Sequence, residues 1–264
     1  GPAQEQLYVF RLRDHFARMS LSCRILRIDL PGDPDELAAL VVELLRRNDV
    51  RTDAYVRPLA YKAARSIKVA LTGLRGGFAM FTFPLGAYLP TTGLAAKTTS
   101  WRRTSDDALP ARGKITGAYV NTALAVDEAH EANAEEAIFL TRDGHVSEGG
   151  SANVFMVRDG ELVTPPVHDD ILEGITRDSL LRLAREELGL RVRERSIDRS
   201  ELYVADEVFF CGTGAQVAPC VSVDARTVGD GTIGPVSRAL AELYEAIARG
   251  TDPRHAEWRT PVYR

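Results

Sequence analysis

The sequence predicts a mixed α/β (α+β) protein with two domains. Amphipathic helical stretches are interspersed with short runs rich in β-branched and aromatic residues. In the second half, Asp-Gly pairs, which are strong hairpin signals, separate several of these runs. A polar stretch at residues 98–110 separates two parts of a 264-residue chain, and such a length and polarity are typical of a connection between domains.

The first part begins with a helix expected at residues 10–23. A second helix is marked by Asp33 as N-cap, Pro34 at the first position and Glu36 completing a capping box. The apolar positions of this second helix are Leu37, Leu40, Val41, Leu44 and Leu45. Three strand-like runs follow, at residues 54–61, 66–73 and 78–86.

The second part begins with a helix expected at residues 116–132. Short strands then surround two turns, Asp143-Gly144 and Asp159-Gly160. Residues 174–190 have a helical period, with Leu180, Leu183, Ala184 and Leu188 on one face. Strands are expected at residues 191–197 and 207–214, and a last helix at residues 235–249.

The composition excludes several classes of function. The formal net charge is −4 and no basic run occurs, so we expect no nucleic-acid partner. The apolar stretches are too short to cross a membrane, and we identify no signal peptide. The cysteines, Cys23, Cys211 and Cys220, are odd in number and lack metal-ligand spacing. We therefore expect a reducing, cytoplasmic location, no disulfide and no metal.

Lys114 has unusual neighbours for a surface lysine. It stands between Gly113 and Ile115, with Gly117 and Tyr119 shortly after it. A lysine amine becomes a nucleophile when desolvation or a nearby charge lowers its pKa, and this setting offers desolvation. The alternative is an ordinary solvated lysine at a loop.

Three further loops carry polar chemistry. Glu148 precedes two glycines, where a carboxylate calls for a cation, either a pyridinium nitrogen or an arginine. Ile175-Thr176 opens a helix, and the turn Gly212-Thr213-Gly214 ends a strand, so both suit a phosphate. For each of the two turns taken alone, an ordinary structural role is the favoured interpretation. Together with Lys114 these features match the needs of pyridoxal phosphate.

The chain resembles the fold-type IV pyridoxal-phosphate enzymes, which have the D-amino acid aminotransferase-like fold, and within them the branched-chain amino acid aminotransferases. The resemblance runs nearly end to end. It is carried by YVRPL (55–59), FPLGAYL (83–89), SWRR (100–103), LPARGKITGAYVN (109–121), VSEGGSANVFMV (146–157), LVTPP…ILEGITRDSLLRLA (162–184), ELYVADEVFFCGTGAQVAP (201–219) and IGPVS (233–237).

The resemblance implies roles for particular residues. Lys114 would form the Schiff base with the cofactor and shuttle the substrate proton, Glu148 would face the pyridine nitrogen, and Tyr119 the phenolic oxygen. The phosphate would be bound by Arg27, Ile175, Thr176, Gly212 and Thr213. The substrate would be bound by Tyr55, Arg57, Trp101, Gly214 and Ala215.

The resemblance also implies an architecture. It places a small domain at residues 1–104, an interdomain loop at 105–110 and a large cofactor-binding domain at 111–264. Further strands would precede the small domain's first residues here and contribute aromatic residues to the substrate pocket, so that domain is expected to lack them. Where the family reads Gly-Thr-Ala-Ala-Glu, this chain has Gly-Thr-Gly-Ala-Gln at residues 212–216, which predicts a more flexible turn with one charge fewer.

The resemblance predicts a homodimeric transaminase. It would move the amino group of branched-chain or other hydrophobic L-amino acids to a 2-oxo acid, with 2-oxoglutarate as the expected acceptor. Three alternatives stay open at this point. They are a D-amino acid or (R)-amine transaminase, an aminodeoxychorismate lyase-type enzyme, and a catalytically inert protein that binds pyridoxal phosphate.

Overall fold

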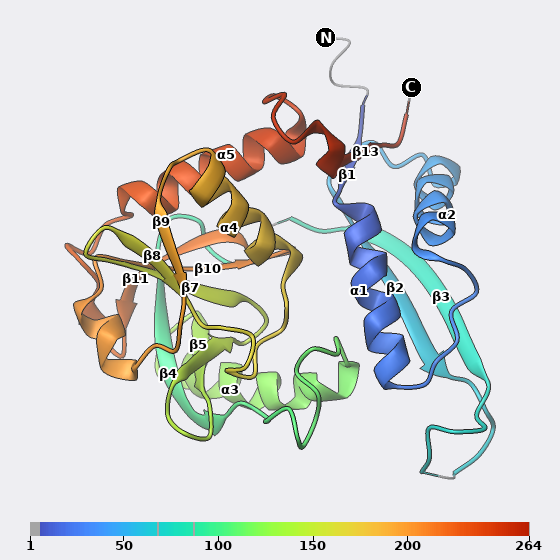
Figure 1. Ribbon diagram of the computed structural model, residues 1–264, viewed down its shortest axis with the longest axis horizontal. Helices are drawn as coiled ribbons and strands as arrows, with labels where there is room; N and C mark the ends of the chain where they lie inside the picture. Colours follow the sequence, from blue (N-terminus) through green and yellow to red (C-terminus); the bar gives the residue numbers. More distant parts are fainter. Residues whose placement is uncertain (1–5, 68, 87, 264) are drawn as a thin grey trace. The chain divides into compact units, whose positions relative to one another are not determined.

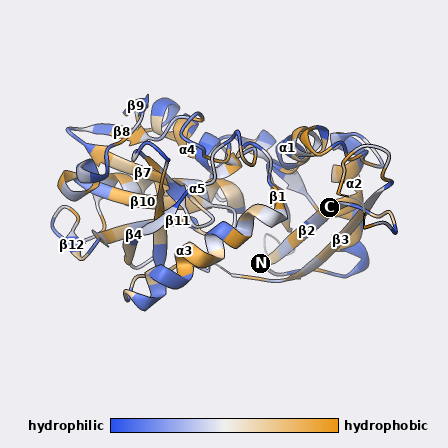
Figure 2. Ribbon diagram, turned by 90° about the horizontal axis from the view of Figure 1, so that it is seen from below, coloured by the Kyte–Doolittle hydropathy of each residue, from blue (hydrophilic) through white to orange (hydrophobic). Residues whose placement is uncertain are grey.

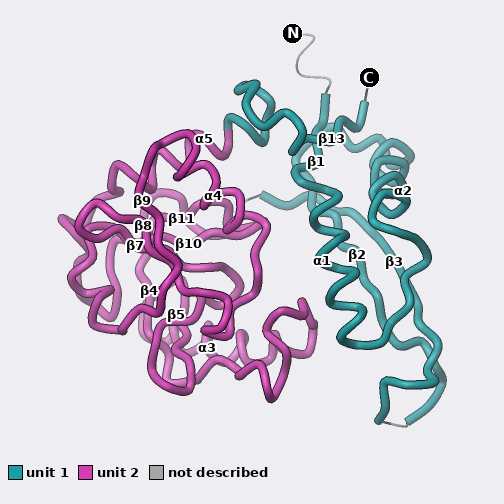
Figure 3. The backbone as a smooth tube through the Cα atoms, in the orientation of Figure 1, with its two compact units in different colours: residues 1–86, 246–264 teal, residues 87–245 magenta. Residues whose placement is uncertain are grey.

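The computed structural model describes residues 6–67, 69–86 and 88–263, and the chain divides into two compact units (Figure 3). Unit 1 is Gly1–Gly86 with Ala246–Arg264, and unit 2 is Ala87–Glu245. This division differs from the boundary expected at residues 105–110, because the strand at residues 94–102 belongs to the sheet of unit 2. The C-terminal residues also differ from expectation, because they return to unit 1 and pair there with its first strand.

Unit 1 packs two helices against a long hairpin (Figure 1). Its elements are β1 (Tyr8–Phe10), α1 (Leu12–Ile25), α2 (Pro34–Arg47), β2 (Ala54–Lys62), β3 (Gly76–Pro84), a 3₁₀ turn at Ala256–Trp258 and β13 (Arg259–Pro261). The predicted start of α2 is confirmed. The Asp33 side chain accepts hydrogen bonds from the backbone N–H groups of Asp35 and Glu36, and the Glu36 carboxylate accepts one from the Asp33 N–H. Because this cap depends on residues at most three apart, the sequence alone reveals it.

Two expectations for unit 1 are wrong. Residues 66–73 form no strand in their described part, because β2 and β3 pair with each other from Ala54↔Pro84 to Lys62↔Gly76 and leave this segment as their connection. The apolar stripe of α2 is also narrower than expected. Leu37, Val41 and Leu45 are buried, whereas Leu40 is 48% exposed and Leu44 is half-buried.

Unit 2 is built on a mixed sheet that joins nine strands among the described residues, in the order β6-β5-β4-β11-β10-β7-β8-β9, with β12 beside β11. The strands are β4 (Leu94–Arg102), β5 (Glu136–Leu140), β6 (Val146–Gly149), β7 (Asn153–Arg158), β8 (Glu161–Thr164), β9 (Arg191–Glu194), β10 (Glu207–Gly212), β11 (Gln216–Val223) and β12 (Arg226–Thr227). β7 and β10 lie in the middle and are largely hydrophobic in Figure 2. The residues expected to connect the domains, 98–110, therefore begin inside β4.

The helices of unit 2 confirm the sequence prediction. They are α3 (Tyr119–Glu131), α4 (Ile175–Glu186) and the first part of α5 (Pro235–Arg249), with 3₁₀ turns at Thr116–Ala118 and Arg199–Val204. Small residues of α3, Ala125 and Ala129, pack on Phe139 of β5. In the β7–β8 hairpin, Asp159 and Gly160 both have positive φ, as a type I′ turn requires. The three cysteines are buried free thiols, and no helix among the described residues is long and apolar enough to cross a membrane.

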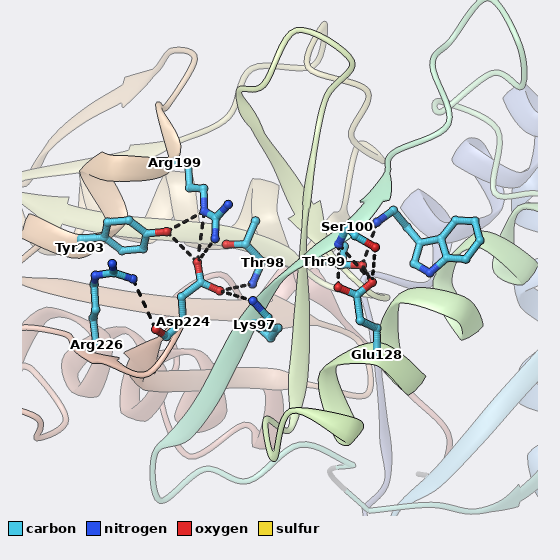
Figure 4. Close-up of polar contacts among 10 residues, drawn as sticks. Lys97, Thr98, Thr99, Ser100, Glu128, Arg199, Tyr203, Asp224 and Arg226 are labelled. Atoms are coloured by element: carbon cyan, nitrogen blue, oxygen red, sulfur yellow. Dashed lines mark hydrogen bonds and ion pairs between the residues drawn. The ribbon is translucent and has the colours of Figure 1, made fainter.

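Asp224, at the turn after β11, ties three parts of unit 2 together (Figure 4). Its carboxylate is almost fully buried and accepts hydrogen bonds from the Thr98 N–H (2.8 Å), the Arg199 guanidinium (2.7 Å) and the Tyr203 hydroxyl (2.7 Å). Burial acts to raise the pKa of Asp224, but the hydrogen bonds from Tyr203, Arg199 and Thr98 hold it well below its ordinary range.

We expect Asp224→Asn to lower the free energy of unfolding by about 1.5–3 kcal/mol at pH 7, the usual range for hydrogen bonds to a charged group. Asparagine tolerates the positive φ of 51° at this position, so the change tests the charge rather than the backbone. The folded-state pKa is depressed, so this stability is present above about pH 4 and is lost as the pH falls. Urea unfolding of both proteins at pH 7 and pH 3 checks this. An equal difference at the two pH values would contradict it.

Candidate functional site

Lys114 and Tyr119 meet at the start of α3. Lys114 follows a turn closed by a hydrogen bond from the Gly113 N–H to the Pro110 carbonyl (3.0 Å). Its Nζ donates to the Tyr119 hydroxyl at 2.6 Å and lies 5.4 Å from the centre of the tyrosine ring. The Lys114 side chain is exposed, so the desolvation expected from its sequence neighbours is absent from this structure. The 3₁₀ turn at Thr116–Ala118 sets the distance between Lys114 and Tyr119, because it brings the tyrosine hydroxyl back toward the amine.

Glu148 is a buried carboxylate at the end of β6, with 6% of its side chain exposed. Its Oε1 lies 2.6 Å from Nη2 of Arg103. Its Oε2 accepts hydrogen bonds from Nδ2 of Asn153 and from the Leu172 N–H, both at 3.0 Å. The cation that the sequence required is therefore an arginine here, and the Arg103 contact leaves Oε1 with further acceptor capacity.

The electrostatics link Glu148 to Lys114. Burial raises the pKa of Glu148, and the Arg103 guanidinium, the Leu172 N–H and the Lys114 ammonium oppose that rise. Both residues were predicted to carry the chemistry. They lie in unit 2, and the charge of Lys114 acts on the Glu148 carboxyl group.

The start of α4 is built against this carboxylate. Gly174 is the N-cap, so the cap residue brings no side chain to the first turn. Asn153, which donates to Glu148, also donates to the Leu172 carbonyl at 3.0 Å. A Cβ on Gly174 would lie 2.1 Å from Oδ1 of Asn153, so only glycine fits at this N-cap. Ile175 and the buried Thr176 follow as the first helical residues. A helix start of this kind suits an anion.

The turn between β10 and β11 contains Gly212, Thr213, Gly214 and Ala215. Gly212 pairs with Gln216, Thr213 is exposed and Ala215 is fully buried. The unusual backbone conformation falls on Gln216, whose φ is 55°. Gly214 does not have a positive φ angle. A left-handed backbone at Gly214 therefore gives no support to the greater flexibility expected of this turn.

Tyr88 explains the glycine at position 214. A Cβ there would lie 2.4 Å from Cε1 of the tyrosine ring. The Tyr88 N–H donates to the Gly214 carbonyl at 3.3 Å, and its hydroxyl hydrogen-bonds Oγ of Ser151 at 2.7 Å. The turn is thereby tied to the loop that follows Glu148.

The remaining predicted residues lie on other elements. Trp101 is on β4 in unit 2, with 44% of its surface exposed. Tyr55 and Arg57 are two residues apart on β2 and so share one face of that strand, where the Tyr55 ring packs against Phe83 with centroids 5.5 Å apart. Arg27 is exposed after α1, with φ 51°. These last three belong to unit 1, and their predicted part in the site stays a prediction.

Residues 5–223 match the family model for class IV aminotransferases. The chain belongs to the class IV aminotransferase family. The family assignment confirms the predicted fold class and the predicted enzyme class, a pyridoxal-phosphate-dependent aminotransferase.

Individual relatives agree with this assignment. A probable branched-chain-amino-acid aminotransferase of Aquifex aeolicus is 42% identical over 261 residues, covering 98% of this chain and 84% of the relative. The branched-chain-amino-acid aminotransferase of Pseudomonas aeruginosa is 36% identical, covering 96% and 83%.

Solved structures give the same result. The Thermoproteus uzoniensis branched-chain aminotransferase with norvaline has a TM-score of 0.95 at 42% identity and covers 99% of this chain and 86% of its own. The Thermobaculum terrenum enzyme in its pyridoxal-phosphate form has a TM-score of 0.94 at 38% identity and covers 98% and 85%.

The residues of this class IV aminotransferase fit its cofactor. Pyridoxal phosphate needs an amine for its aldehyde, a fixed carboxylate for its ring nitrogen and donors for its phosphate. Lys114 offers the amine, Glu148 is held by three donors, and the start of α4 offers N–H groups. The amine, the carboxylate and the N–H groups are the three kinds of group that pyridoxal phosphate requires.

Three residues of the site had no role assigned from the sequence. Arg103 lies within the motif SWRR and Tyr88 within FPLGAYL, so both were visible as part of the resemblance. Asn153 follows the glycines after Glu148. The signal that could have found Arg103 is the requirement of Glu148 for a cation, but the sequence does not show which arginine meets it.

Proposed function

We propose that this aminotransferase transfers the amino group of branched-chain and other hydrophobic L-amino acids to a 2-oxo acid, with 2-oxoglutarate as acceptor. The likeness to branched-chain aminotransferases over almost the whole chain carries the proposal. The Thermoproteus uzoniensis enzyme was crystallised with norvaline, an unbranched apolar amino acid, which supports the wider donor class.

Lys114, Tyr119 and Glu148 are the proposed chemical centre. When bound, pyridoxal phosphate supplies an aldehyde for amines and a ring that withdraws electrons. Lys114 would hold the cofactor and would then move a proton to and from the substrate α-carbon with its Nζ. Tyr119, 2.6 Å from that nitrogen, would orient it and would hydrogen-bond the phenolic oxygen. Glu148 would keep the ring nitrogen protonated, and Arg103 and Asn153 hold Glu148 in place.

The anion sites divide into two groups. Ile175 and Thr176 at the start of α4, with Gly212 and Thr213, are proposed to hold the phosphate, and Arg27 is proposed to add its charge. The Gly214-Ala215 turn is proposed to receive the substrate carboxylate, since its backbone is fixed by Tyr88. Tyr55, Arg57 and Trp101 are proposed to complete the substrate pocket.

We also propose a cytoplasmic homodimer. The three buried free thiols are consistent with a reducing compartment. Ile67 and Val69 in the β2–β3 connection are fully exposed apolar side chains of the single chain, and a second copy could cover them. Light scattering of the purified protein tests the dimer, because a monomeric mass would contradict it.

We expect a donor panel with 2-oxoglutarate to favour L-leucine, L-isoleucine and L-valine. Each apolar methylene in a pocket changes kcat/KM by roughly 10–200-fold, so L-alanine should be well below L-leucine. Formation of glutamate measures the transfer. Preference for D-alanine or an (R)-arylamine would instead indicate a D-amino acid or (R)-amine transaminase. Release of pyruvate from aminodeoxychorismate would instead indicate an aminodeoxychorismate lyase-type enzyme.

A further inference from the structure

The β4 strand is irregular just before it reaches the site. β4 and β5 pair in register at Thr98↔Ile138, and the next pair is Arg102↔Leu140. Between these pairs β4 advances by four residues and β5 by two, so β4 bulges at Thr99–Trp101. Bulges bend a strand and re-aim its side chains, and they are common beside active sites.

A carboxylate of α3 takes the place of the missing strand partner (Figure 4). Glu128 accepts hydrogen bonds from the Ser100 N–H at 2.8 Å, the Ser100 hydroxyl at 2.7 Å and the Thr99 hydroxyl at 2.9 Å. The same Thr99 oxygen accepts a hydrogen bond from the Trp101 N–H at 3.1 Å. Two backbone N–H groups of the bulge are thus satisfied by Glu128, one directly and one through Thr99.

The strength of this arrangement follows from the charge on Glu128. Burial acts to raise the pKa of Glu128, and the hydrogen bonds from Ser100 and Thr99 outweigh that effect and lower it. A carboxylate held in this way stays ionised at neutral pH, and hydrogen bonds to an ionised acceptor are the strong ones. Thr99 is 2% exposed, so the relay to Trp101 is shielded from water.

The helix that carries Glu128 also carries the partner of Lys114. α3 begins at Tyr119, and two residues later Nδ2 of Asn121 donates to the Arg102 carbonyl at 3.2 Å. One helix therefore fixes the bulge itself, the residue that follows the bulge, and the hydroxyl that Lys114 contacts. Trp101 leaves the bulge with 44% of its surface exposed, although its backbone is held.

We propose that Glu128 is a positioning residue for donor selection. It holds the β4 bulge so that the Trp101 ring stands as a fixed wall against the side chain of the amino donor. This inference rests on the proposed function, which places Trp101 in the substrate pocket. Long apolar donors reach that wall and short donors do not, so Glu128 contributes to the preference for chain length without touching the substrate.

Glu128→Gln tests the proposal, because it keeps the shape and removes the charge. We expect KM for L-leucine to rise about tenfold, which corresponds to about 1.4 kcal/mol, while kcat changes less than about twofold. KM for the shorter L-2-aminobutyrate should stay within about twofold of wild type. The exposed neighbour Asp127 supplies the matched control, since Asp127→Asn alters a charge on the same helix turn and should change neither donor.

A second variant and a second measurement keep the test independent of folding. Thr99→Val removes only the relay hydroxyl and should reproduce the rise in KM for L-leucine. Acrylamide quenching of tryptophan fluorescence reports mainly Trp101, because the other tryptophan, Trp258, is 6% exposed. Quenching should increase in both variants and not in Asp127→Asn.

The outcomes separate the two claims. A wild-type enzyme that leaves L-leucine unreacted overturns the proposed function, and the positioning role is then judged by quenching alone. Unchanged quenching in Glu128→Gln overturns the positioning role whatever the donor. Equal losses for L-leucine and L-2-aminobutyrate also overturn it, since they indicate a general structural defect.

Discussion

Lys114→Ala is expected to lower kcat for transamination by on the order of 10²–10⁴-fold, the range that a positioned acid–base group contributes. Loss of the covalent link to the cofactor adds to this effect. Tyr119 has no ammonium to orient in the variant, but Glu148 and the start of α4 are unchanged. The variant should therefore still bind pyridoxal phosphate noncovalently and more weakly, whereas the wild-type protein should be yellow after purification and dialysis.

Lys97→Ala is the matched control, because Lys97 and Lys114 are the lysines between residues 87 and 245. Lys97 contacts Asp224 at 3.4 Å, and its replacement should leave kcat within about twofold of wild type, as for a partly exposed ion pair. Methylamine added to Lys114→Ala supplies the missing amine and should restore part of the activity. Wild-type turnover in the variant would remove Lys114 from the mechanism, and a wild-type protein that stays colourless with added cofactor would remove the cofactor from this site.

Local chemistry made the helices predictable. The N-cap, proline and capping box of α2 lie within four residues, and the two-residue turn of the β7–β8 hairpin lies within two. The last helix was expected at residues 235–249 and is found at Pro235–Arg249. In each case the residues that decide the structure are neighbours in sequence, so no knowledge of the rest of the fold is needed.

β4 shows why the rest could not be predicted. Its sequence, Leu94–Arg102, is polar over its second half and resembles a loop. The strand is nevertheless internal to the sheet, because it pairs with β11 on one side and β5 on the other. Two of its N–H groups also donate to distant carboxylates, Asp224, 126 residues after Thr98, and Glu128, 28 residues after Ser100. A pattern of single residues contains no sign of such distant partners.

The same limit applies to the candidate site. The sequence placed a carboxylate at Glu148 and required a cation for it, and the resemblance suggested which cofactor. The arginine that contacts it and the asparagine that joins it to the start of α4 follow only from the sheet order. Gly174 is likewise explained only by Asn153, which lies too close for any Cβ.

Arg103→Met is expected to lower the free energy of unfolding by about 3–5 kcal/mol, the usual cost of leaving one member of a buried ion pair without its partner. The side chains of Arg103 and Glu148 are 12% and 6% exposed, and their contact is 2.6 Å. Methionine replaces the aliphatic part of the arginine, so the loss reports the charge. Urea unfolding at several pH values measures it, and Arg103→Met with Glu148→Gln should recover part of the loss.

The loss of stability in Arg103→Met should depend on pH, whereas a loss caused by a packing defect should not. Burial already raises the pKa of Glu148, and loss of the Arg103 charge removes the first opposing influence, so that pKa rises further. A raised folded-state pKa gives stability that is present below the unfolded value of about 4.3 and is lost as the pH rises through the folded value. The difference from wild type should therefore grow as the pH rises above about 4.3. Arg112→Met, which removes an exposed arginine paired with Asp106 and Glu173, should cost at most about 1 kcal/mol at every pH. Equal, pH-independent losses in the two variants would show that Glu148 is not held by Arg103, because only a buried carboxylate deprived of its cation becomes less stable as it ionises.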